Sequence, residues 1–134
     1  MPGLKDVIPS REMVLEMPTE KLAGILLSIV GPHRQRSEGM FLPHIVGQIS
    51  SGQGFNHFGY VVGNDRAVEG ATAEAWQWLE RAGLVLPAAP PNGANGFRVL
   101  SRDGEKIAIN ASDRAQAYAI SRAAYRARSN SFRR

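Results

Sequence analysis

The chain has 134 residues, of which 43% are hydrophobic and 21% are charged, values that are typical of one globular domain and exclude an intrinsically disordered chain. It has no cysteine, which excludes disulfides, thiol nucleophiles and cysteine-based zinc sites. Its net charge of +4 is unevenly distributed, because residues 1–112 carry ten Lys and Arg against eleven Asp and Glu, whereas residues 113–134 carry six Arg against one acid.

The N-terminal half of the chain predicts one clear helix. Residues 1–18 are mixed and interrupted by proline, so we expect an N-terminal arm without a regular element. A helix is expected from Thr19 to Val30, because apolar residues recur at helical spacing, Thr19 caps the start and Gly31-Pro32 stops it. Residues 40–50 have a pattern compatible with a short second helix, and the glycine-rich residues 51–65 are expected to form a long loop with room for a short strand.

The second half of the chain has a stronger pattern. An apolar stripe predicts a third helix from Arg66 to Ala82, with Gly83 at its C-terminal end. Residues 84–86 and 97–101 are expected to form the two strands of a β-hairpin, joined by a connector rich in turn residues. A further helix or turn is expected from Ser101 to Ile109, and an alanine-rich helix from Asp113 to about Arg128.

Three helices followed by a hairpin are the order of a winged helix-turn-helix, and one segment strengthens this interpretation. The sequence AEAWQWLERAGLVLP, a Pro/Gly/Asn connector and GFRVLSRDGEKI together resemble many bacterial winged-helix domains, in which a helix ends in W-L-E-R-x-G-L, a wing follows, and a strand closes on a Ser/Thr-Arg-x-Gly turn. More closely, residues 73–107 are similar to the N-terminal domain of an uncharacterised bacterial family that is sometimes linked to abortive infection or phage defence, in which this unit precedes a larger C-terminal domain.

The resemblance implies an α+β fold, a winged helix-turn-helix with a three-helix core and a β-hairpin wing, here with an additional C-terminal helix. We therefore divide the chain into an N-terminal arm (1–18), a winged-helix domain (19–112), and a basic C-terminal helix and tail (113–134).

Nucleic-acid binding, with DNA as the partner, is the leading functional hypothesis. In a DNA-reading domain of this type the third helix enters the major groove and the wing touches the backbone. The three glutamates of the third helix weaken this interpretation, because they oppose phosphate. The predicted C-terminal helix is amphipathic, with arginines and tyrosines on one half, although a solvated face without a partner would show the same pattern. The candidate nucleic-acid-binding residues are Gln77, Arg81, Arg98, Arg114, Arg122 and Arg126.

A protein-interaction module that forms a homodimer or docks another protein is the rival hypothesis. Trp76 and Trp78 cannot both face the core, because residues two apart on a helix point in nearly opposite directions. Trp76 belongs to the apolar stripe, so Trp78 is either exposed or covered by the arm, the wing or a second subunit. The candidate interface residues are Trp78, Leu84 and Ile120. A third hypothesis makes the chain the recognition domain of a larger defence protein.

Catalytic, metal-binding and membrane functions are not expected. The three histidines, His33, His44 and His57, lack the close spacing of most metal sites, and the glycines between residues 52 and 63 lack the lysine of a P-loop. No serine lies in a G-x-S-x-G turn. We therefore expect neither an enzyme nor a cofactor. Residues 22–30 are too short to span a bilayer and the N-terminus lacks a signal-peptide pattern, so we expect a cytoplasmic protein.

Overall fold

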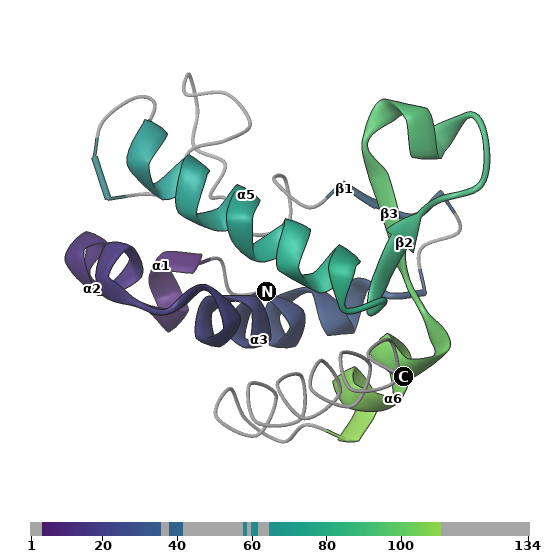
Figure 1. The fold of residues 1–134 in the computed structure, drawn as a ribbon, viewed down its shortest axis with the longest axis horizontal. Helices are drawn as coiled ribbons and strands as arrows, with labels where there is room; N and C mark the ends of the chain where they lie inside the picture. The colour runs from purple at the N-terminus through teal and green to yellow at the C-terminus, as the bar shows by residue number, and fades with distance from the viewer. Residues whose placement is uncertain (1–3, 36–37, 42–57, 59, 62–64, 111–134) are drawn as a thin grey trace, which may run out of the picture.

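The computed structural model describes residues 4–35, 38–41, 58, 60–61 and 65–110, and this part of the chain is an α+β structure (Figure 1). Its α-helices are α1 (Leu4–Val7), α2 (Arg11–Glu16), α3 (Thr19–Val30), α5 (Arg66–Arg81) and α6 (Arg102–Asn110). Its strands are β1 (Met40–Phe41), β2 (Val85–Pro87) and β3 (Phe97–Leu100), and two short 3₁₀ turns are η1 (Gly31–His33) and η2 (Asn92–Asn95).

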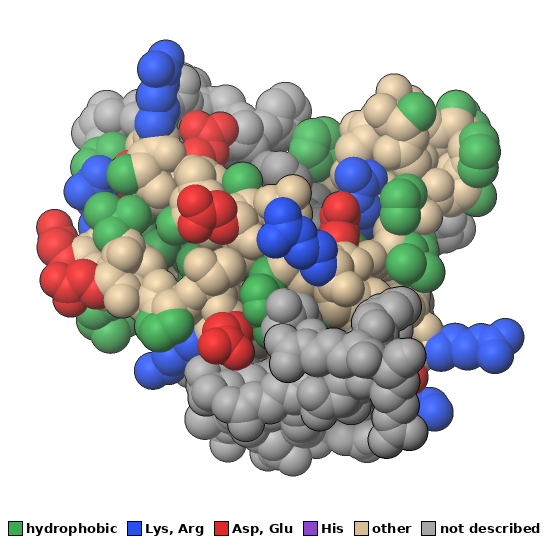
Figure 2. All heavy atoms as spheres, in the orientation of Figure 1, with side chains coloured by type: hydrophobic (Ala, Val, Ile, Leu, Met, Phe, Trp, Pro, Cys, Tyr) green, Lys and Arg blue, Asp and Glu red, His purple; other side chains and the backbone are tan. Residues whose placement is uncertain are grey.

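The N-terminal segment forms two helices, so the prediction of an arm without a regular element was wrong. Leu4, Ile8 and Val14 are buried in the core, and α2 packs against α5. The hydroxyl of Tyr60 donates a hydrogen bond to the carbonyl oxygen of Ile8 at 2.5 Å. Hydrophobic and acidic side chains lie at the surface over α2 (Figure 2). With four and six residues, α1 and α2 are too short for a helical period to show in the sequence.

Helix α3 lies in the centre of the core and begins and ends at the predicted residues. Buried side chains occur on almost every side of this helix. Helix α5 packs against one side, and other parts of the chain cover the remaining sides. Pro18 takes the N-cap position, so the expectation that Thr19 caps this helix was wrong. After Val30 the chain continues directly into η1, on which α6 packs. Within the described ranges no helix combines the length and apolar character needed to cross a membrane.

Helix α5 confirms the predicted stripe, since its buried residues repeat at helical spacing: Val68, Thr72, Ala75 and Leu79. It ends one residue before the predicted position. Gly83 has a φ of 73°, and its N–H donates to the carbonyl oxygen of Glu80 at 3.0 Å while the N–H of Leu84 donates to that of Leu79 at 3.0 Å. This is a Schellman motif, in which the residue after the glycine packs back on the last turn of the helix.

This turn places Leu84 in the core. Its side chain is fully buried, as is that of Leu79. The prediction that Leu84 lies at an exposed protein interface was therefore wrong, because the Schellman turn brings the residue after Gly83 inward.

The three strands form one antiparallel sheet in the order β1-β3-β2. The predicted hairpin is confirmed, with Leu86 opposite Val99 and Pro87 opposite Arg98. Met40 and Phe41 were predicted to begin a helix, but they form β1 and pair with Arg98 and Phe97. Their alternating burial is that of a strand with one face on the core. The remainder of that predicted helix, residues 42–50, lies outside the described residues.

Helix α6 confirms the helix expected after Ser101. The Ser101 hydroxyl accepts the N–H of Gly104 at 3.0 Å and so caps the helix, while the Ser101 N–H donates to the carbonyl oxygen of Leu84 at 2.9 Å. Gly104 packs so closely on Leu84 that an added Cβ would overlap the same carbonyl oxygen. The Ser-Arg-Asp-Gly turn therefore fixes the start of α6 against the end of α5.

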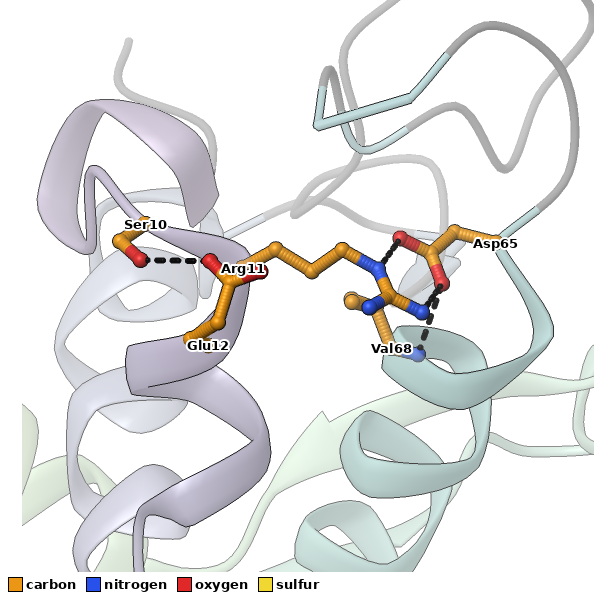
Figure 3. A network of polar contacts seen from close by, with 5 residues as sticks. All are labelled: Ser10, Arg11, Glu12, Asp65 and Val68. Atoms are coloured by element: carbon orange, nitrogen blue, oxygen red, sulfur yellow. Dashed lines mark hydrogen bonds and ion pairs between the residues drawn. The ribbon is translucent and has the colours of Figure 1, made fainter.

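An ion pair joins α2 to the start of α5 (Figure 3). Nε and Nη2 of Arg11 donate to Oδ2 and Oδ1 of Asp65 at 2.8 and 3.2 Å, and Oδ1 also accepts the N–H of Val68 at 3.3 Å. Asp65 is thus the N-cap of α5 as well as the partner of Arg11. Its side chain is 4% exposed, and the hydrogen bond from Arg11 holds the pKa of its carboxyl group below the ordinary value.

Two substitutions at Asp65 separate the cap from the ion pair. Asp65→Ala loses both interactions, whereas Asp65→Asn keeps a capping oxygen but loses the charge and one of the two acceptors of Arg11. We expect Asp65→Ala to have a free energy of unfolding about 1 kcal/mol below that of Asp65→Asn in urea titrations near neutral pH. Equal values for the two variants would contradict the capping role.

The ion pair also predicts a pH dependence. Because the pKa of Asp65 is lowered on folding, its stabilising contribution is present above the ordinary value of 3.8 and is lost as the pH falls through the folded value. The stability of the wild type should therefore fall more than that of Asp65→Asn as the pH is lowered below the ordinary value of 3.8. Parallel pH profiles would show that the charge of Asp65 is not stabilised in the folded protein.

The close approach at Gly104 gives a prediction with a matched control. Gly104→Ala should destabilise the protein despite the helix propensity of alanine, because the added Cβ would overlap the Leu84 carbonyl oxygen. Gly70→Ala, on the exposed face of α5 where an added Cβ meets no described atom within 4 Å, should stabilise it by about 0.5–1 kcal/mol. Thermal unfolding measures both, and a stabilising Gly104→Ala would contradict this packing.

Candidate nucleic-acid interface

The exposed face of α5 is the first part of the candidate interface. Gln77 and Arg81 lie one turn apart on this face, opposite the buried stripe, and both are exposed. Glu74 is exposed on the preceding turn. Acidic and basic side chains both occur along the front of α5 (Figure 2). This face is therefore polar and able to donate hydrogen bonds, but it is not strongly basic.

The loop between β2 and β3, residues 88–96, is the second part. The N–H of Ala88 donates to the carbonyl oxygen of Phe97 at 3.1 Å, which closes the loop at its base. Directly before β3, the N–H of Gly96 donates to the carbonyl oxygen of Gly93 at 3.2 Å, with Gly96 in the left-handed region at a φ of 94°. Asn92 in η2 donates from Nδ2 to the carbonyl oxygen of Glu38 at 3.2 Å. The loop is therefore held in shape by its own backbone and by the segment before β1.

Arg98 joins this loop to α5. Its Nε atom lies 2.6 Å from Oε1 of Glu80, and Nη1 donates to the carbonyl oxygens of Gly93 and Phe97 at 3.2 and 3.0 Å. Glu80 lies in the last turn of α5, where the helix dipole disfavours a negative charge. The guanidinium therefore neutralises one of the three glutamates that we expected to oppose phosphate.

Trp76 and Trp78 are both half-buried and pack against the core. The expectation that only one of the two could reach the core was therefore wrong, because a large indole side chain can contact the core from the flank of a helix. The role of Trp78 in a protein interface stays a prediction. Four further candidates lie outside the described residues, which leaves their contacts as predictions too: Arg114, Ile120, Arg122 and Arg126.

We did not predict the apolar outer face of the sheet. Directly paired residues project to the same side, so Phe41 and Phe97 share one face with Leu86 and Val99, while Met40 and Val85 face the core. Phe41 is 42% exposed, Leu86 is 44% exposed, and the Phe41 and Phe97 rings meet edge to face at 5.6 Å. This face depends on the pairing of Phe41 with Phe97, which no local pattern in the sequence shows.

The described residues contain no cluster of three or more His, Cys, Asp or Glu side chains arranged to hold a metal ion. The site that they form is instead a polar helix face beside a closed hairpin loop. Comparisons with protein-family models, with curated proteins and with solved structures yield no match.

Proposed function

We propose that the chain is a bacterial winged-helix module that binds nucleic acid, with duplex DNA as its partner. The observation that carries this proposal is the joining of α5 to the hairpin that follows it. The Schellman turn at Gly83 sends the chain from α5 directly into β2, and Arg98 bonds to Glu80 and to the loop. The exposed face of α5 and the loop then act as recognition helix and wing. The order α3, β1, α5, β2, β3 supports the same assignment.

Most of the binding energy in this proposal comes from the C-terminal segment. Residues 1–112 are nearly neutral, and two of their arginines, Arg11 and Arg98, are engaged by carboxylates within the fold. Phosphate contacts are therefore assigned to the six arginines of residues 113–134, foremost Arg114, Arg122 and Arg126. Gln77 and Arg81 approach the groove and give a modest sequence preference.

The same module would suit the recognition part of a larger defence protein, as the resemblance of residues 73–107 implies. In that case the chemistry of defence resides elsewhere, and this chain supplies contact with nucleic acid in the cytoplasm.

Binding of the full chain to a labelled DNA duplex, measured across a range of salt concentrations, tests the proposal. If all six C-terminal arginines contact phosphate, the logarithm of the association constant should fall with the logarithm of salt concentration with a slope of roughly −5. Replacing Arg114, Arg122 and Arg126 together by glutamine should make the slope shallower by about 3. Absence of binding at low salt would refute the proposal.

The apolar outer face of the sheet favours a second function, homodimerisation. Two exposed side chains, Phe41 and Leu86, lie with Phe97 and Val99 on a face that carries no charged residue from the three strands. A second copy of the chain would cover this face with the same side chains, as a two-fold interface requires.

Light scattering coupled to size exclusion tests this second function. Leu86→Lys should convert a dimer to a monomer, because it places a charge in the apolar contact. Leu15→Lys is the matched control, since Leu15 is similarly exposed, at 40% against 44% for Leu86, but lies on α2. A monomeric wild type, or equal effects of the two substitutions, would contradict dimerisation through the sheet.

A further inference from the structure

The position of Arg98 in the sheet is unusual for a residue that contacts a polyanion. It lies opposite Met40 in β1 and Pro87 in β2, on the face of the sheet that also holds the buried side chain of Val85. Its own side chain is only 24% exposed. An arginine that contacts phosphate needs an exposed guanidinium, whereas this one contacts oxygens of its own chain.

The three acceptors of Arg98 belong to three parts of the fold. Glu80 is in the last turn of α5, Gly93 is in η2 within the loop, and Phe97 closes the base of the loop by accepting the N–H of Ala88. The backbone leaves little freedom at Gly93, because a Cβ there would overlap the carbonyl oxygen of Ala88. One guanidinium therefore links the helix to the inside of the loop at Gly93 and to its base at Phe97.

We propose that Arg98 is a positioning residue, which together with Glu80 sets the orientation of the β2–β3 loop relative to α5 and does not itself contact the partner. This inference rests on the proposed function for its consequence in binding, but the link between loop and helix exists in the free protein. Arg98 thus differs in role from Arg81, which is exposed on α5 and free to approach a groove in the proposed complex.

The proposal reverses the effect expected of Glu80. If Glu80 acted only through its charge, removing it from a surface that binds phosphate should strengthen binding. If Glu80 instead holds Arg98 and the loop in place, Glu80→Gln should weaken binding although the protein becomes more positive. Glu74→Gln is the matched control, because it removes the same charge from the exposed face of the same helix without altering the ion pair.

The first arm of the test uses the free full-length protein. Amide hydrogen exchange is measured at Ala88, Gly93 and Gly96, whose N–H groups donate within the loop, with Leu84 as the reference amide at the end of α5. Glu80→Gln and Arg98→Gln should speed exchange at the three loop amides about fivefold, the size expected for loss of an exposed ion pair, and leave Leu84 unchanged. Unchanged loop exchange in both variants would overturn the proposal.

The second arm measures DNA binding of the same variants against salt concentration. Arg98→Gln should lower the affinity without changing the salt slope, whereas loss of a direct phosphate contact would make the slope shallower by about 0.9 and overturn the proposal. Glu80→Gln should lower the affinity and Glu74→Gln should not. If Glu80→Gln raises the affinity as Glu74→Gln does, Glu80 acts by charge alone and the proposal fails. Should the wild type bind no DNA, the proposed function fails, while the exchange arm still decides whether Arg98 positions the loop.

Discussion

The ion pair between Arg11 and Asp65 ties the N-terminal helices to the start of α5, the helix on which the proposed function depends. It lies at the start of the longest described helix, and the same carboxylate caps that helix through Val68. Because Asp65 is buried, its charge requires the partner that Arg11 provides. The N-terminal helices are thus part of the core, and together with α3, which makes the main contact with α5, they set the orientation of its exposed face.

At its other end, α5 is held by the Schellman turn and by the pair of Glu80 with Arg98. Each end of the helix is therefore tied by a guanidinium to an element distant in sequence. Arg11 and Arg98 count among the basic residues of the composition, but these two ion pairs engage them within the fold. In our account, residues 1–112 supply shape and hydrogen-bonding groups, whereas residues 113–134 supply charge. A separation of this kind favours affinity that depends strongly on salt and a modest sequence preference.

The sequence predicted the long periodic helices α3 and α5, the hairpin and α6, because each rests on local spacing and turn residues. It did not reveal α1, α2 or β1. The first two are too short to show a period, and β1 has only two residues whose strand conformation depends on pairing with β3. Gly83 marks the end of a helix in the sequence, but the burial of Leu84 depends on the backbone hydrogen bonds of the Schellman turn, which no local pattern shows. The partner of Arg98 depends on strand register, which no local pattern shows.

The central claim is that the exposed face of α5 and the β2–β3 loop form one nucleic-acid-binding surface. Chemical-shift mapping of the full-length protein during titration with a DNA duplex tests this most directly. We predict that the largest shifts occur at Gln77 and Arg81 and at Asn95, which is exposed in the β2–β3 loop, together with amides of residues 113–134. Shifts confined to residues 113–134, or centred on Phe41 and Leu86 at the outer face of the sheet, would contradict the assignment of recognition to α5 and the loop.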